Sequence, residues 1–328
     1  WILDDIGPLR QLDATVARAD VHLFQPEDPV LGVAGSLRVA YLLGAPVDAL
    51  RVEILDGAGS VVESWEAESP EEEEGEGEVE EEEEDAPWQR GGGPELSMEE
   101  GLHSFSWNLR YPGATEFPDM ILWAASTRFG PEAAPGEYTV RLTADGASVE
   151  RPFRVRTDPR RPDVTEEDLA ERFRFSVEIR DRLSEANDAV RLIRGIEGQV
   201  EDRLEARPDD AELESAARSL RAELNAVEGE IYQVRNQSNQ DPLNYPIKLN
   251  NRIGALMGVV QNAPGRPTAQ SYEVFEMLSA QLAQQLDRLD EVVDQDLDRF
   301  NQLLESRDLA PVELRMIPEE EDEDEAEG

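Results

Sequence analysis

The hydrophobic periodicity changes once along this chain, and that change constrains the fold more than any single motif. From Val21 to about Thr157 apolar residues alternate with polar ones, and from Thr165 onward they recur at steps of three and four. Alternation is typical of half-buried strands, whereas the longer step is typical of amphipathic helices. We therefore predict a β domain followed by a helical domain.

The first region predicts short strands separated by turns. The clearest spans 135–146, where Tyr138, Val140 and Leu142 share one face between the turn signals Pro135-Gly136 and Asp145-Gly146. Further strands are predicted within 36–43, 50–55, 60–65, 103–109 and 151–160. Short strands at this spacing favour an immunoglobulin-like antiparallel β-sandwich over residues 20–158.

The second region predicts an antiparallel helical bundle over residues 159–310, with three long helices and one short helix. Thr165 followed by three acidic residues is an N-cap signal, and the helix that it starts continues to a break at 207–210. A second helix follows this break. A short third helix is predicted from Leu249 to Val260, and a fourth from Thr268 to Leu304.

Acidic residues dominate the charge of the chain, which has a net charge of −43. Two tracts concentrate them, and we predict a disordered insertion at about 67–95 and a disordered tail at 311–328. Lys248 is the only lysine, and an acidic, arginine-dependent surface is typical of adaptation to high salt, although a GC-rich genome also favours arginine. Nucleic acid is an unfavourable partner because phosphate binding needs a basic face.

Several chemistries are excluded or disfavoured by residue usage. The chain has no cysteine and only two histidines, His22 and His103, so we predict neither a zinc site nor a cofactor. There is no run of about 18 apolar residues, so no membrane span is expected.

The segment 111–136 is long for a loop and unusually apolar, and we predict that it packs on the β domain or on a neighbour. Its candidate interaction residues are Phe117, Met120, Trp123 and Phe129. Trp123 could also stack on a sugar. A glycosidase would need two carboxylates, for which Glu116 and Asp119 in the same loop are the first candidates.

The order of several segments resembles the C-terminal region of large secreted bacterial β-propeller proteins with BNR-type or sortilin-like repeats, which are often labelled glycosyl hydrolases. The segments that carry the resemblance are WILDDIGPLRQ (1–11), HSFSWNLRYPG (103–113), PGEYTVRL (135–142), DPR (158–160) and RPTAQSYEVFEMLSAQLAQQL (266–286). The resemblance implies that residues 1–19 are the closing strand of an upstream propeller plus a linker. It also implies an exported protein, extracellular or periplasmic, and it transfers no catalytic residue.

Two functions remain open at this point. The first is a non-catalytic scaffold that packs against the upstream propeller or against further copies of the chain. The alternative is a carbohydrate-binding or hydrolytic module. Asn236-Gln237-Ser238 also matches an N-glycosylation sequon.

Overall fold

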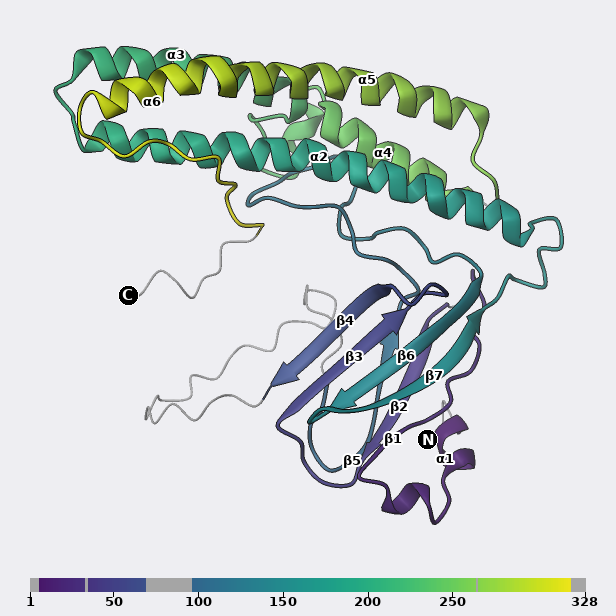
Figure 1. Cartoon of the computed structure of the whole chain (residues 1–328). Helices are drawn as coiled ribbons and strands as arrows, with labels where there is room; N and C mark the ends of the chain where they lie inside the picture. Colours follow the sequence, from purple (N-terminus) through teal and green to yellow (C-terminus); the bar gives the residue numbers. More distant parts are fainter. Residues whose placement is uncertain (1–5, 33–34, 69–95, 264, 320–328) are drawn as a thin grey trace. The chain divides into compact units, whose positions relative to one another are not determined.

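The computed structural model describes residues 6–32, 35–68, 96–263 and 265–319 (Figure 1). The chain forms two compact units: a β unit made of residues 1–112 and 132–170, and a helical unit made of 113–131 and 171–328. Antiparallel sheets therefore precede a long helical region, as predicted. The division differs from the predicted boundaries in one respect, because residues 113–131 belong to the helical unit.

The β unit contains two antiparallel sheets. Strands β1 (Val21–Leu23), β2 (Leu37–Leu43) and β5 (Gly101–Trp107) form one sheet in the order β1-β2-β5. The other sheet has the order β4-β3-β6-β7 and contains β3 (Ala49–Leu55), β4 (Val61–Glu68), β6 (Gly136–Ala144) and β7 (Ala147–Val155). Both sheets contribute to one core, in which Tyr41, Trp107 and Leu142 are buried.

Turn chemistry sets the register of this unit. The hairpin between β6 and β7 turns at Asp145 and Gly146, with φ values of 46° and 82°, and this is the predicted Asp-Gly turn. The Asp145 carboxylate also accepts hydrogen bonds from the backbone N–H groups of Asp48 and Ala49, at 3.0 and 3.1 Å. One turn thus fixes both its own hairpin and the start of β3.

The residues before β1 are ordered rather than a plain linker. Residues Gly7–Gln11 form the short helix α1, and Val16–Arg18 form a 3₁₀ turn. The Gln11 side chain exchanges two hydrogen bonds with the backbone of Gln25, at 2.9 and 3.0 Å. The strand predicted at Trp1–Leu3 lies outside the described residues, as does the acidic insertion from residue 69 to residue 95.

The helical unit is built from α2 (Glu166–Glu205), α3 (Ala211–Ile231), α4 (Leu249–Asn262), α5 (Ala269–Val292) and α6 (Asp298–Glu305). A π-helical turn, Val293–Leu297, joins α5 to α6 without a break, so the predicted fourth helix is one long element with a local irregularity. Thr165 caps α2 as predicted, since its Oγ1 accepts the Asp168 N–H at 3.1 Å.

Helices α3 and α4 lie end to end beside α2, and both run antiparallel to it (Figure 1). The contact Arg194–Glu228 joins α2 to α3, and Asn187–Asn250 joins α2 to α4. Helix α5 runs parallel to α2, as the contacts of Tyr272 with Glu171 and of Ser279 with Arg182 show. The connection 232–248, which contains the 3₁₀ turn Asp241–Leu243, therefore leaves the helices halfway along the unit.

Residues 309–317 form an extended C-terminal segment that runs back along α2. The Gln199 side chain exchanges two hydrogen bonds with the backbone of Glu313, both at 2.9 Å, and Asn301 does the same with Val312 at 2.8 and 3.0 Å. A Cβ on Gly195 would lie 1.9 Å from the Arg315 carbonyl oxygen. The predicted disordered tail is therefore wrong for residues 311–317, and residues 320–328 lie outside the described part.

In the described ranges, no helix is both long enough and apolar enough to cross a membrane.

Candidate interaction surface

The loop 113–131 leaves the β unit after β5 and is closed at its base. The Ala114 N–H donates to the Thr127 carbonyl at 3.1 Å, and a Cβ on Gly113 would lie only 1.8 Å from that oxygen. The loop then follows α4, since Gln261 donates to the Gly130 carbonyl at 3.3 Å. The sequence predicts this segment as part of the β domain, but it belongs to the helical unit because its partners are helical residues.

Phe117 anchors the loop in the helical core. Its side chain is 2% exposed and meets Tyr232 edge to face, with the ring centroids 4.9 Å apart. The Arg194 guanidinium lies 4.7 Å from the centroid of the Phe117 ring and donates to the buried Glu228 carboxylate at 3.0 Å. The cation is thus shared between an aromatic face and a carboxylate, an arrangement suited to the planar guanidinium.

Asparagine side chains form a set of hydrogen bonds near the break between α3 and α4. Asn250 donates to Asn187 at 3.2 Å, and Asn187 donates to the Thr115 carbonyl at 2.7 Å. Asn251 bonds to both backbone groups of Trp123, at 2.7 and 2.8 Å. Asn187, Asn250 and Asn251 are all buried, and such groups are stable only when hydrogen-bonded. The loop supplies partners for Asn187 and Asn251, and Asn250 bonds to Asn187 and to the Asn251 N–H.

The four predicted interaction residues divide into two pairs. Phe117 is in the core and Met120 packs against it, whereas Trp123 is 42% exposed and Phe129 is 54% exposed. Only Trp123 and Phe129 are therefore available to a partner. The loop packs on the helical unit of the same chain through Phe117 and Met120, not on the β domain.

The two candidate carboxylates have structural surroundings. The Glu116 carboxylate accepts a hydrogen bond from the hydroxyl of the buried Thr127 near the base of the loop. Asp119 adopts a left-handed backbone conformation with φ of 61°, and its carbonyl accepts from the Tyr232 hydroxyl at 3.3 Å. Both residues thus hold the shape of the loop.

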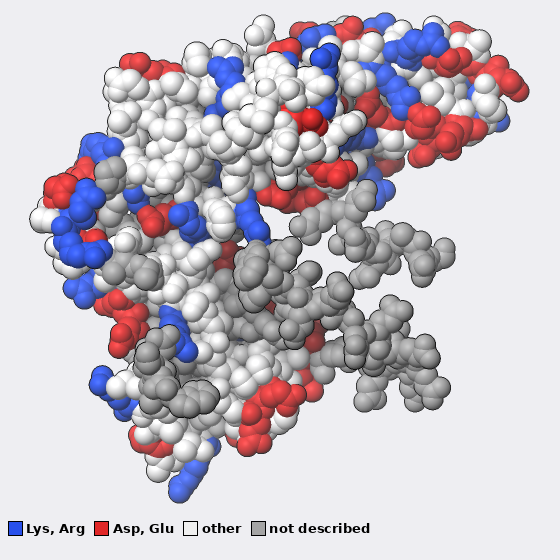
Figure 2. Space-filling model, turned by 180° about the vertical axis from the view of Figure 1, so that it is seen from behind, with Lys and Arg blue, Asp and Glu red and all other residues white. Residues whose placement is uncertain are grey.

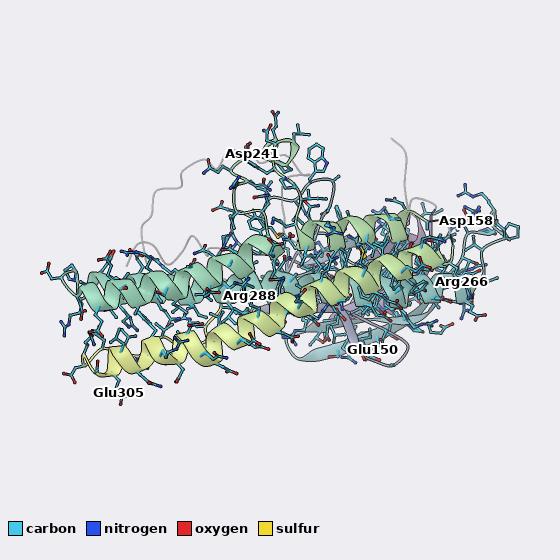
Figure 3. The ribbon with its side chains drawn as sticks, turned by 90° about the horizontal axis from the view of Figure 1, so that it is seen from above. Glu150, Asp158, Asp241, Arg266, Arg288 and Glu305 are labelled. Atoms are coloured by element: carbon cyan, nitrogen blue, oxygen red, sulfur yellow. The ribbon has the colours of Figure 1, made fainter. Side chains whose placement is uncertain are left out.

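Both the loop and the connection 232–248 expose apolar side chains. We define the junction face by Trp123, Val234, Leu243 and Ile247, which are 42%, 49%, 67% and 37% exposed. Hydrogen bonds join their segments: Asn236 donates to the Ile121 carbonyl at 3.3 Å, and Gln233 donates to the Pro246 carbonyl at 2.9 Å. In Figure 3, Asp241 lies at the outer end of this connection, well away from α5 and α6.

Three of the four junction-face residues, Val234, Leu243 and Ile247, lie within an acid-poor part of the chain. Residues 231–272 contain one acidic residue, Asp241, and four basic ones, although the whole chain carries 74 acidic residues. In Figure 2 the part of the helical unit with α4 is mainly white, while the part with α3 and α6 carries many red and blue side chains. This gap in acidity is visible in the sequence, although hydrophobic periodicity does not reveal it.

The basic groups of this region already have partners. The Arg235 guanidinium lies 5.6 Å from the centroid of the Tyr245 ring, and Lys248 pairs with Glu230 at 3.4 Å. Arg252 donates to Gln281 at 3.1 Å. The region is thus weakly charged rather than strongly positive.

Beside the break, burial perturbs two titratable groups. Burial raises the pKa of the Glu197 carboxyl, and the nearby Glu228 carboxylate raises it further. Burial also raises the pKa of the Tyr232 hydroxyl, which donates to the Asp119 carbonyl and accepts the Ile121 N–H at 3.1 Å. Both pKa shifts follow from packing between helices.

Within the described residues, no group of three or more His, Asp or Glu side chains is arranged to hold a metal ion.

Asn236, the asparagine of the predicted glycosylation sequon, forms the hydrogen bond that joins the connection to the loop. Asn236 uses its Nδ2 to bond the Ile121 carbonyl, and its Oδ1 is buried. Glycosylation at Nδ2 would attach a sugar to the atom that bonds the connection to the loop.

A hollow lies on the β unit, over the sheet β4-β3-β6-β7, and its arginines are paired. Arg51 pairs with Glu66 at 2.5 Å, and Arg141 pairs with Glu53 and Glu150 at 3.3 and 2.8 Å. Both arginines of the hollow are therefore paired with glutamates of the same sheet.

No protein-family profile matches the chain, and no curated protein matches it. Among solved structures, CopC from Methylosinus trichosporium OB3b is 14% identical, with 42% of this chain and 94% of that chain covered and a TM-score of 0.20. An engineered protein is 13% identical, covers 42% of this chain over 20% of its own length, and has a TM-score of 0.20. A Bifidobacterium dentium β-glucuronidase is 15% identical, with 42% and 18% covered and a TM-score of 0.18. The chain thus spans about a fifth of the last two proteins, and at these TM-scores the similarities carry no functional argument.

Proposed function

We propose that this chain is a non-catalytic assembly module that packs against another protein surface through the junction face. The observation that carries the proposal is the exposure of Val234, Leu243 and Ile247 in the acid-poor part of a chain with a net charge of −43. Exposed Trp123 is hydrogen-bonded to Asn251 of the same part. Interface centres are depleted in charge and enriched in aromatic and aliphatic side chains, and clustered apolar exposure marks interaction sites.

The rigidity of the face supports this role. The backbone of Trp123 is held by Asn251, and the connection 232–248 is tied to the loop through Asn236. A surface that is already ordered loses little conformational entropy on binding. Glu116 and the backbone groups of Asp119 and Trp123 form hydrogen bonds within the chain. This supports a packing role for the loop over a catalytic one.

The proposed architecture of the module is an immunoglobulin-like sandwich followed by an antiparallel bundle. The strand orders β1-β2-β5 and β4-β3-β6-β7 support the sandwich, since this is the arrangement of immunoglobulin-like domains with one edge strand moved to the other sheet. The opposite directions of α2 and the α3–α4 pair support the bundle.

The proposed context is the C-terminal part of an exported, salt-adapted propeller protein, in which the upstream propeller is one candidate partner. The order of the sequence segments described above supports this context, and so does the acidic, lysine-poor composition.

A carbohydrate-binding module is the second candidate function. It rests on Trp123, whose exposed indole could stack on a sugar ring. Trp107 is buried and Trp65 packs against the β core, so Trp123 is the most exposed indole in the described ranges.

Hydroxyl-radical footprinting tests the assembly function. Two samples are compared: the longer propeller protein proposed above, and the isolated chain at low concentration. Trp123, Leu243 and Ile247 should react less with hydroxyl radicals in the longer protein. Exposed Val61, on strand β4 of the other unit, serves as the control and should react equally in both. Equal reactivity of Trp123 and Leu243 in both samples would sink the proposal. A change in Trp fluorescence with an oligosaccharide panel that is lost in Trp123→Phe would instead support the carbohydrate function.

A further inference from the structure

The junction face raises the question of which surface covers it, and electrostatics narrows the choice. Two copies of this chain each carry a net charge of −43, so most approaches bring acidic surfaces together and are repulsive. An isologous contact places one patch against the same patch of a second copy. A self-contact is therefore favourable only where acidic residues are scarce, and residues 231–272 form such a stretch.

The state of the basic groups argues against an acidic partner. Arg235 lies on the Tyr245 ring and Lys248 is paired with Glu230, so little positive charge is left to attract a polyanionic surface. What the face offers is apolar area, and the same connection carries the exposed amide residues Gln237, Asn239 and Asn244. A weakly charged face of this kind is complementary to itself.

From these observations we propose that the junction face binds the junction face of a second copy, forming a two-fold dimer. This inference rests on the proposed assembly function and names its partner. The four apolar side chains form the centre, and Leu243, the most exposed of them, enters the apolar surface of the partner copy.

The dependence of association on salt separates this dimer from other contacts. Added salt screens the remaining repulsion between the two acidic bodies, so the isologous dimer becomes tighter as salt increases. A contact between the junction face of one copy and an acidic surface of another would gain from charge attraction, and it would become weaker with salt.

The test is sedimentation velocity of the full chain over a concentration series at low and high NaCl. We expect a monomer–dimer equilibrium in which the dimer fraction rises with salt. Leu243→Glu and Leu243→Arg should each raise the dimer dissociation constant at least about tenfold, because both bury a charge at the centre of the contact. Met277→Glu, at a 45% exposed position on α5, is the matched control and should leave it unchanged. Circular dichroism verifies that each variant is folded.

Three outcomes would overturn the inference. The first is a monomer at every concentration and salt level, and the second is a dimer unaffected by both Leu243 variants. The third is a dimer that Leu243→Glu weakens while Leu243→Arg strengthens, which indicates an acidic partner surface. A strict monomer whose junction face is nevertheless protected in the natural protein would remove the dimer and leave the assembly function standing.

Discussion

Trp123 and Asn251 form a reciprocal pair of hydrogen bonds. The Trp123 N–H donates to Asn251 Oδ1 at 2.7 Å, and Asn251 Nδ2 donates to the Trp123 carbonyl at 2.8 Å. One side-chain amide thus satisfies both backbone groups of a loop residue, as a neighbouring strand would. The same geometry recurs where Gln199 holds Glu313 and where Asn301 holds Val312. Helices in this unit hold extended segments through amides.

Replacing Asn251 by Asp should detach the loop at Trp123. The carboxylate cannot donate, so the Trp123 carbonyl would face a second acceptor in a buried site, and we expect a loss of about 2–3 kcal/mol in the free energy of unfolding. Urea unfolding measures this loss, and acrylamide quenching of Trp fluorescence should increase. Asn262→Asp is the control, because Asn262 is exposed and bonds only within its own helix end; it should change stability by less than about 0.5 kcal/mol. Equal losses in both variants would contradict the role of the pair.

Local sequence signals predicted the elements of this fold well. The Asp145-Gly146 turn and the Thr165 cap both form as expected, because a turn or a cap depends on a few adjacent residues. The change in hydrophobic periodicity placed the helical region correctly, because amphipathic spacing is also a property of neighbouring residues along the chain. The π-helical turn 293–297 was not predicted, since the apolar spacing through Leu297 still reads as a continuous helix.

Local sequence signals could not predict which part of the fold each extended segment packs against. Phe117 and Phe129 look alike in the sequence, yet one is in the core and the other is exposed, because their burial depends on helices more than 50 residues away. Val312 and Glu313 are held along α2 by residues that no local pattern links to them. The junction face was missed for a different reason: the gap in acidity is visible in the sequence, but only the fold shows which apolar residues within it are exposed.

The two phenylalanines of the loop should differ sharply on truncation. Phe117→Ala removes a buried ring from the helical core and from contact with Arg194, and we expect a loss of about 3–5 kcal/mol. Phe129→Ala removes an exposed ring and should change stability by less than about 0.5 kcal/mol. Denaturant unfolding followed by helical circular dichroism compares the two. If the two variants unfold alike, the loop does not pack as described.

The glycines of α2 offer a test of the C-terminal segment. Gly195→Ala places a methyl group 1.9 Å from the Arg315 carbonyl oxygen, so residues 309–317 must move, at a cost of about 1–3 kcal/mol. Hydrogen exchange should then accelerate at the Val312 and Glu313 amides. Gly198→Ala, where nothing lies within 4 Å of the added carbon, should be neutral or stabilising by up to about 1 kcal/mol. Unchanged protection of both amides in Gly195→Ala would contradict the close approach.

Glu197 should make the stability of the helical unit depend on pH. Burial, reinforced by Glu228, raises the pKa of its carboxyl above the ordinary value of 4.5, so the folded state binds the proton more tightly than the unfolded state does. Ionised Glu197 therefore opposes folding at neutral pH, and this effect disappears as the pH falls through the raised pKa toward 4.5.

Replacing Glu197 by Gln removes the charge and keeps an oxygen to accept the Asn225 amide, which donates to Glu197 at 2.8 Å. We expect the variant to be more stable than the original chain at pH 7, with the difference declining to near zero below pH 4.5. Urea unfolding of both proteins across this pH range measures the difference and cancels the contributions of the other carboxylates. A difference that does not change with pH, or a variant less stable at pH 7, would show that the carboxylate is solvated or paired strongly enough to favour its charge. The sign of the difference therefore reports whether burial or pairing dominates where α2 meets α3.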